Sequence, residues 1–298
     1  MKMNHTHPVP IRCVGIALAM LFVASFALAA APKVEDVKMM KTPDGVEFGV
    51  WGGTPDKPSP TLILLSGVIP DTFAKTNFLR AGEILEPKGY LCVSIELPCH
   101  GSQAKKGYSN LVGWGKRAAE GDDFVAEFNA RMKKVIDHLI EQKMTDPDKI
   151  VATGTSRGGF LAVRYAAFDK RVKATVAYAP VTDLRKLKEF EIAKDVTSVD
   201  AMSLEAHIPE MIGRPLLMFI GDRDDRVSTD SLIAFARKLS AAAQKADVPS
   251  QVEFHVMSEP RGHSLPAGVE NFAAEWIVRS LEAKPPEAKS SEKAPAKE

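Results

Sequence analysis

Short apolar runs alternate with amphipathic stretches along most of the chain. The runs are rich in Val, Ile and Leu, which is typical of strands buried on both faces of a parallel sheet. The predicted strands lie at 61–67, 90–97, 149–154, 172–180, 215–222 and 250–257. Apolar residues recur at helical spacing between them, at 77–86, 124–140, 158–168, 229–245 and 266–281. The alternation predicts βαβ units and a mostly parallel sheet with helices on both faces.

Three further segments complete the expected organisation. A turn at Pro43-Asp44-Gly45 separates two short apolar runs and predicts a hairpin that brings the sheet to eight strands. The stretch from Pro98 to Gly121 is expected to be a glycine-rich loop. Residues 181–214 interrupt the regular alternation, so we expect a small cap there.

The two ends of the chain depart from this pattern. Lys2 and Arg12 precede an uncharged apolar run, and Ala27-Leu28-Ala29 offers a signal-peptidase site. We therefore expect residues 1–29 to be a secretory signal and the protein to be exported, to the periplasm or beyond. An uncleaved anchor helix is the alternative; cleavage would leave no stable membrane span. Residues 283–298 lack large apolar side chains and should be a disordered tail, which leaves a domain at 33–282.

Charge and cysteine content exclude some classes of function. Removing Lys2 and Arg12 with the signal takes the 39 basic residues to 37, against 38 acidic ones. This balance gives no electrostatic reason to expect a nucleic acid or an anionic membrane as partner. We expect a small-molecule or short acyl substrate, and the oligomeric state stays open. No cofactor is expected. No metal site is expected either, because His5 and His7 lie in the predicted signal and no other close ligand spacing occurs. Cys92 and Cys99 are expected to be free thiols.

A candidate nucleophile lies where a predicted strand meets a predicted helix. Gly154-Thr155-Ser156-Arg157-Gly158 matches G-x-S-x-G, and its glycines leave room for a sharp turn that aims the serine hydroxyl out above the sheet. The alternative is an ordinary helix N-terminus with Ser156 as its cap. Adjacent Cys99 and His100 form a second nucleophile candidate, although neighbouring residues seldom present their side chains to each other.

A catalytic serine needs a base and an acid to orient that base. His263 lies in the loop between the last strand and the last helix, where its side chain can reach over the sheet edge. Three aspartates, Asp222, Asp224 and Asp225, follow the strand at 215–222, and the residues alone leave open which one would be the acid. The resulting chain order is Ser, Asp, His.

With these sites in this order, residues 37–281 resemble the α/β-hydrolase superfamily, nearest to its dienelactone hydrolase and prolyl oligopeptidase-like branch. The resemblance implies an α/β-hydrolase fold with an eight-stranded, mostly parallel sheet and a small cap. It places the nucleophile on Ser156 and the base on His263. The stretch from Gly221 to Val227 matches the branch's G-x-x-D-x-x-V, which places the acid on Asp224.

The resemblance also implies an oxyanion hole made of two backbone N–H groups, those of Arg157 and Val68. Many members read His-Gly-x where this chain reads Ser66-Gly67-Val68. Cys99 stands where relatives often have glycine, and His100 is expected to be structural.

The function implied is a serine hydrolase that cleaves a carboxylic ester through an acyl-enzyme. Peptidase relatives carry a large N-terminal domain, whereas few residues separate the predicted signal from the first strand, and an ester is the easier leaving group. The alternatives are a serine peptidase and a non-catalytic binding protein. Residues of the loop and cap are expected either to line an acyl pocket or to pack the cap onto the core: Tyr108, Trp114, Leu184, Leu187 and Phe190.

Overall fold

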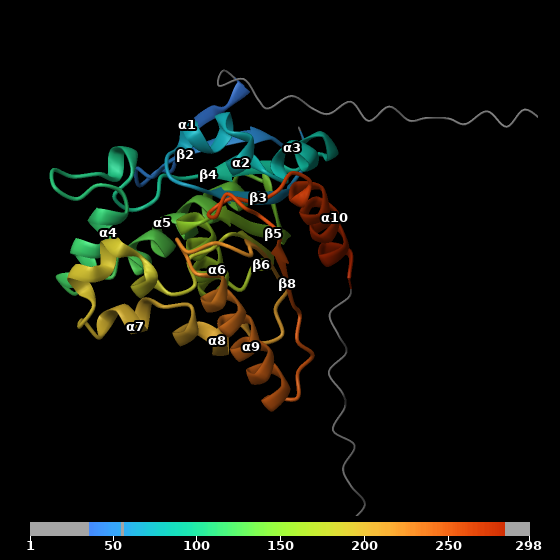
Figure 1. The fold of residues 1–298 in the computed structure, drawn as a ribbon. Helices are drawn as coiled ribbons and strands as arrows, with labels where there is room; N and C mark the ends of the chain where they lie inside the picture. The colour runs from blue at the N-terminus through green and yellow to red at the C-terminus, as the bar shows by residue number, and fades with distance from the viewer. Residues whose placement is uncertain (1–35, 55–56, 284–298) are drawn as a thin grey trace, which may run out of the picture.

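A computed structural model describes residues 36–54 and 57–283. The predicted signal at 1–29 and, apart from Ala283, the predicted tail lie outside the described residues. The described part contains one sheet of eight strands in the order β1-β2-β4-β3-β5-β6-β7-β8 (Figure 1). The strands are β1 (Lys38–Lys41), β2 (Glu47–Gly52), β3 (Ser59–Leu65), β4 (Leu91–Ser94), β5 (Thr145–Thr155), β6 (Val172–Tyr178), β7 (Leu216–Gly221) and β8 (Val252–Met257).

The sheet is parallel except at one end. β1 pairs with β2 and β2 pairs with β4 in the antiparallel sense, whereas every pair from β4 to β8 is parallel. Leu65 at the end of β3 lies opposite Gly154 near the end of β5. The carboxyl ends of the central strands therefore share one edge, and the predicted eight-stranded, mostly parallel sheet is confirmed.

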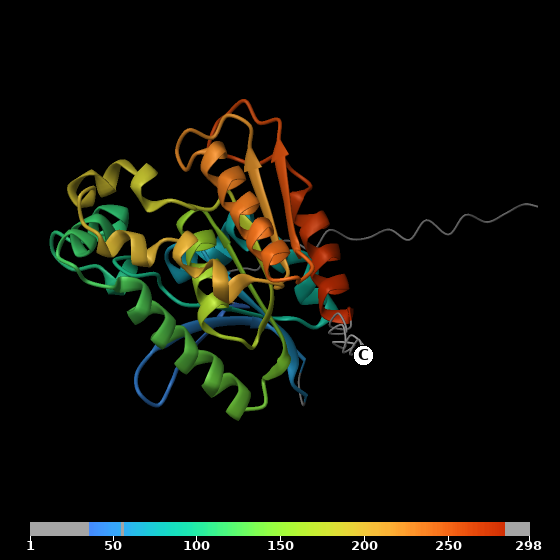
Figure 2. The same ribbon diagram turned by 90° about the horizontal axis from the view of Figure 1, so that it is seen from below.

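Helices cover both faces of the sheet and bury a separate apolar cluster on each. Figure 2 shows α10 and α5 on opposite sides of the strands. One face carries α4 (Asn110–Ala119), α5 (Phe124–Glu141), α6 (Arg157–Phe168) and α9 (Thr229–Lys245). The other carries α1 (Ile69–Ala74), α2 (Thr76–Leu79), α3 (Gly82–Leu85), the 3-10 turn η2 (Glu86–Lys88) and α10 (Val269–Glu282).

Local sequence explains where the long helices begin and which way they face. Asp123 caps α5, because its carboxylate accepts hydrogen bonds from the N–H groups of Val125 and Ala126 at 3.1 and 2.9 Å. Phe124, Phe128, Val135 and Leu139 recur at helical spacing in α5, and all are fully buried. The apolar stripe thus fixes the face that packs on the sheet.

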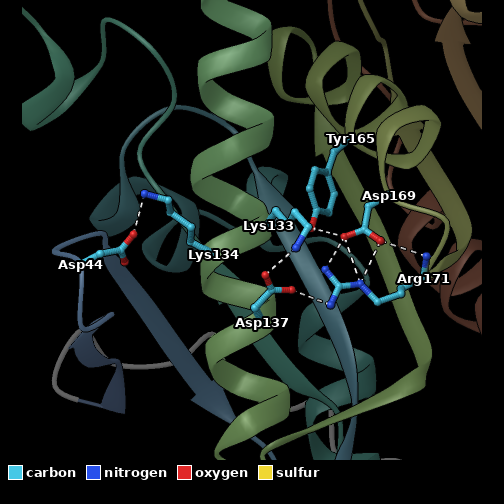
Figure 3. A network of polar contacts seen from close by, with 7 residues as sticks. All are labelled: Asp44, Lys133, Lys134, Asp137, Tyr165, Asp169 and Arg171. Atoms are coloured by element: carbon cyan, nitrogen blue, oxygen red, sulfur yellow. Dashed lines mark hydrogen bonds and ion pairs between the residues drawn. The ribbon is translucent and has the colours of Figure 1, made fainter.

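A polar network fastens α5 and α6 to the start of β6 (Figure 3). Arg171 donates to Asp137 of α5 at 2.7 Å and to Asp169, at the end of α6, at 2.6 Å. Tyr165 also donates to Asp169 at 2.8 Å. Burial alone would raise the pKa of Asp169, but the hydrogen bonds from Arg171 and Tyr165 lower it. The network holds the edge of the sheet opposite to the carboxyl ends of its strands.

Two predicted elements differ from the structure. The helix expected at 77–86 is divided into α2 and α3, because Arg80 between them has φ 49°, outside the helical region. The loop expected from Pro98 to Gly121 contains η3 (Gly101–Gln103) and the helix α4. Glycine disfavours helices, yet a Cβ on Gly115 would lie 1.9 Å from the carbonyl oxygen of Glu189. Close packing therefore requires glycine inside this helix.

Residues 181–214, the predicted cap, contain only short helical segments. These are η4 (Leu184–Lys186), η5 (Lys188–Ala193), α7 (Ser198–Met202), η6 (Glu205–His207) and α8 (Ile208–Met211). Asp183 caps η4 by accepting from the N–H of Arg185 at 2.9 Å. The segment η5 packs directly on α4, where Gly115 meets Glu189.

The contact between α4 and the cap makes a stability prediction. We expect Gly115→Ala to lower the free energy of unfolding by about 3 kcal/mol, because the added methyl group must displace the backbone of η5. Urea unfolding followed by circular dichroism measures this loss. Gly121→Ala is the control, since that glycine has φ 76° and open space around it, and should lose only about 1 kcal/mol. Wild-type stability in Gly115→Ala would contradict the packing described.

Candidate active site

Ser156 occupies a strained turn between β5 and α6. Its backbone has φ 58° and ψ −117°, a conformation that residues with a side chain rarely adopt. Its N–H donates to the carbonyl of Tyr178 on β6 at 2.8 Å. A Cβ on Gly154 would lie 2.3 Å from the backbone of Gly158, and one on Gly158 would lie 1.9 Å from the carbonyl oxygen of Leu65. The two glycines are therefore required for the turn to close.

The hydrogen bonding of the Ser156 hydroxyl distinguishes a helix cap from a candidate nucleophile. A capping serine would accept a hydrogen bond from an N–H group in the first turn of α6, but this side chain makes no such bond. Its oxygen instead lies 3.0 Å from Nε2 of His263. The geometry favours the nucleophile interpretation over the helix-cap interpretation.

His263 and Asp224 complete a chain of hydrogen bonds that starts at Ser156. Nδ1 of His263 lies 2.7 Å from Oδ2 of Asp224. The other carboxylate oxygen accepts from the N–H groups of Arg226 and Val227 at 3.1 and 3.2 Å. Asp224 is 1% exposed, so water is excluded from this carboxylate. An imidazole placed in this way has its Nδ1 proton fixed and its Nε2 lone pair directed at the serine.

The structure separates the roles of the three aspartates after β7. Asp224 contacts His263, whereas Asp225 is exposed. Asp222 accepts a hydrogen bond from the N–H of Glu259 at 2.8 Å, and it thereby joins the loop after β7 to the loop that carries His263. Without the family pattern, the residues alone leave these roles open, because those of Asp222 and Asp224 depend on contacts with the loop after β8.

A second ion pair supports the histidine loop, and the sequence analysis missed it. Arg261 donates to both oxygens of Glu259 at 2.7 and 2.6 Å. These hydrogen bonds hold the pKa of Glu259 down to about 2. The ion pair could have been predicted from the sequence, because Glu259 and Arg261 have opposite charges and lie two residues apart in a turn. Gly221 meets Gly262 closely, with a Cβ on the former only 3.0 Å from the carbonyl of the latter.

The cap also contacts the loop after β7, which carries Asp224. Arg226 donates to both carboxylate oxygens of Glu189 in η5 at 2.7 and 2.9 Å. Arg226 lies two residues after Asp224, and its own N–H donates to that aspartate. No local pattern in the sequence indicates this pair, because its members belong to different elements.

The alternative Cys99–His100 pair lacks the geometry of a nucleophile and its base. Cys99 is buried, and burial raises the pKa of its thiol, so the thiolate is disfavoured. Nδ1 of His100 donates to the carbonyl of Pro98 at 2.8 Å. Cys99 has φ 62°, which explains why a glycine suits this position in relatives. Cys92 and Cys99 are both free, as expected.

The proposed pocket residues are mostly unavailable to a substrate. Trp114, Leu184 and Leu187 are at most 1% exposed and belong to the core cluster under the cap. Nε1 of Trp114 donates to the carbonyl of Pro98 at 2.6 Å. The pocket assignment is corrected for these three: they pack the cap onto the core, because their apolar surface is already fully covered. Phe190 is buried in the same way, while Tyr108 is half-buried and packs at the edge of this cluster.

The expected oxyanion loop follows the strand beside β5. Val68 directly precedes α1, and the carbonyl of Gly67 accepts from the N–H of Leu97 at 2.9 Å. Since β3 and β5 are neighbours, this loop and Arg157 lie at adjacent strand ends. The role of the two N–H groups in catalysis stays a prediction.

Residues 36–54 and 57–283 contain neither a membrane span nor a metal-ligand cluster. None of the helices in these residues has the length and hydrophobicity of a transmembrane helix. The same residues contain no group of three or more His, Cys, Asp or Glu side chains that could hold a metal ion.

Comparison with solved structures shows which fold this arrangement belongs to. Dipeptidyl peptidase 4 of Porphyromonas gingivalis is 17% identical with a TM-score of 0.60, over 82% of this chain. The chain spans only 35% of that protein's length. An esterase of Pyrococcus furiosus is 21% identical with a TM-score of 0.54, and the match covers 83% of this chain and 88% of the esterase. Acetyl xylan esterase 1 of a Thermoanaerobacterium species is 14% identical with a TM-score of 0.60, and the match covers 85% of this chain and 86% of that enzyme.

Comparison at the level of sequence identifies the family. A search of curated proteins finds no match to this chain. The sequence profile of the prolyl oligopeptidase family, in contrast, matches residues 125–277, which is more than half of the chain and includes Ser156, Asp224 and His263. The protein therefore has the α/β-hydrolase fold, and it belongs to the prolyl oligopeptidase family.

Proposed function

We propose that this protein hydrolyses carboxylic esters, with Ser156 as nucleophile, His263 as base and Asp224 as the acid that orients the base. The observation that carries the proposal is the unbroken chain of hydrogen bonds from the serine oxygen through the imidazole to a buried carboxylate, at 3.0 and 2.7 Å. This chain lies at the carboxyl edge of the sheet, where the strained turn exposes the serine.

The chemistry would run in two halves. Nε2 of His263 takes the proton of Ser156 as the serine oxygen bonds to the carbonyl carbon, and the N–H groups of Val68 and Arg157 receive the negative oxygen. The alcohol leaves with the proton from His263, and an acyl-enzyme remains. A water molecule then gives a proton to His263 while the water oxygen attacks the acyl carbon. His263 returns this proton to the serine oxygen, and the carboxylic acid is released. Asp224 stabilises the imidazolium in both halves.

One chemical argument supports an ester over a peptide bond as substrate. An alkoxide is a better leaving group than an amide nitrogen, so a triad needs less assistance to expel it. The similar solved structures include two esterases as well as a dipeptidyl peptidase. Peptide hydrolysis is the second candidate function, and the match to the prolyl oligopeptidase family favours it.

Removing the nucleophile tests the serine mechanism. We expect Ser156→Ala to lower ester turnover by at least about 10⁴-fold without changing the folded structure, because the remaining groups only bind and polarise the carbonyl. A fluorophosphonate probe should label the wild type at Ser156 and leave the variant unlabelled. Turnover near the wild-type rate in this variant would rule out the mechanism, and an unlabelled wild type would support a non-catalytic binding protein.

Replacing the acid tests the assignment among the three aspartates. Asp224→Asn should reduce turnover by about 10³- to 10⁴-fold, because an amide cannot stabilise the imidazolium and its NH₂ group favours the wrong tautomer of His263. Steady-state kinetics on an acyl ester measures the effect. Asp225→Asn removes the same charge from the exposed neighbour and should stay within about threefold of the wild type. Equal losses in the two variants would contradict the assignment.

The choice between ester and peptide is tested with matched substrates. We expect acyl esters to be hydrolysed with higher kcat/KM than amides that share the same acyl group, after division by the uncatalysed rate of each substrate. Proline-containing aminoacyl amides belong in the panel, because the family match suggests them. A higher corrected kcat/KM for the amides would replace the ester proposal by the peptidase one.

A further inference from the structure

The guanidinium of Arg157 is a charge without a hydrogen-bond or ion-pair partner among the described residues, and it lies beside the proposed nucleophile. Arg157 follows Ser156 directly, and its side chain is half-buried. It makes no hydrogen bond or ion pair with any residue that the structure describes, and its Nε is buried without a partner. Burial lowers its pKa, although a guanidinium stays charged in a protein. A poorly hydrated cation without a partner is unfavourable until an anion binds to it.

The nearest carboxylates are already engaged elsewhere. Asp71 and Glu189 are close enough to act on the charge of Arg157. Asp71, however, accepts from Lys75 at 2.6 Å, and both oxygens of Glu189 are held by Arg226. Since each carboxylate is matched by another cation, one positive charge is left over at this place.

The position of the guanidinium relates it to the reaction. Nη2 of Arg157 lies 3.0 Å from where a Cβ on Gly67 would be, and the ring of His100 is 3.5 Å from the same point. Gly67 precedes Val68, whose N–H is proposed to bind the carbonyl oxygen of the substrate. The free charge therefore lies beside the loop that would hold the scissile carbonyl.

His100 contributes a second unsatisfied atom but no charge. Its Nδ1 donates to Pro98, so Nε2 is an acceptor, and this atom is buried without a partner in the described structure. Burial, with a smaller contribution from the nearby charge of Arg157, lowers the pKa of His100 to about 4. The ring is thus neutral near pH 7, so it neither adds to the positive charge of Arg157 nor balances it.

We propose that Arg157 binds a carboxylate of the substrate, and that the natural substrates are esters with a carboxylate close to the scissile bond. The inference rests on the proposed esterase function. One unpaired positive charge matches a monoanion such as a carboxylate, whose two oxygens fit the guanidinium fork. A phosphate monoester would bring more negative charge than this single cation balances. Arg157 would thus select the substrate with its side chain while its backbone N–H serves the oxyanion.

The experiment uses two pairs of esters that differ by one carboxylate. 4-Nitrophenyl hemisuccinate and 4-nitrophenyl butyrate share a leaving group, and a carboxylate in the first replaces a methyl group in the second. 4-Acetoxybenzoate and its methyl ester place the carboxylate on the leaving group instead. The measured quantity is the ratio of kcat/KM within each pair, which cancels any general loss of activity in a variant.

We expect Arg157→Gln to reduce the carboxylate preference in one pair by about 10- to 100-fold, which is the range for hydrogen bonds to a charged group. The pair affected tells whether the carboxylate belongs to the acyl group or to the alcohol. Arg157→Lys should retain part of the preference, because it keeps the charge and loses the fork. Arg223→Gln, which removes an exposed guanidinium from the loop after β7, should leave both ratios unchanged. Unchanged ratios in Arg157→Gln would overturn the inference while the esterase function stands.

A binding measurement separates this inference from the proposed function. Calorimetric titration of Ser156→Ala with 4-nitrophenyl hemisuccinate and with 4-acetoxybenzoate should show binding of at least one ester, at least tenfold weaker in Ser156→Ala/Arg157→Gln. If the variants bind in this way but the wild type hydrolyses neither ester, the esterase proposal is refuted and the carboxylate site is supported. Equal affinity in the single and double variants would refute the site, whatever the wild type hydrolyses.

Discussion

The strained backbone of Ser156 is the constraint on which the rest of the site depends. A residue at φ 58° and ψ −117° is disfavoured by about 1–3 kcal/mol, so the surrounding structure must hold it in place. Gly154 and Gly158 allow β5, α6 and β3 to approach closely enough, and the carbonyl of Tyr178 fixes the N–H of the serine. The turn keeps the hydroxyl from capping α6, so it remains free for His263.

Most of the fold could be predicted from the sequence because its signals are local. Buried parallel strands appear as continuous apolar runs, and the helix at 229–245 was predicted with its observed bounds. The proximity of Ser156 and His263 could also be predicted, since chain order and loop position point to both residues. Asp224 required the family pattern, because three neighbouring aspartates look alike until their partners are known.

The errors arose where contacts between distant segments override local preference. Gly113 and Gly115 argued for a loop, yet the backbone there is helical because the glycines let α4 pack against Cys99 and against the cap. Arg80 carries no signal for a break, although its positive φ ends the helix predicted around it. Trp114 was a candidate for the pocket because large apolar residues serve both binding and packing, and only burial distinguishes the two roles.

The bidentate contact between Arg226 and Glu189 joins the cap directly to the loop that carries Asp224. Grafting a different cap onto this scaffold would remove one of the contacts that hold the loop of Asp224, even if Ser156, Asp224 and His263 were all kept. A modular exchange would therefore have to transfer both members of the pair together.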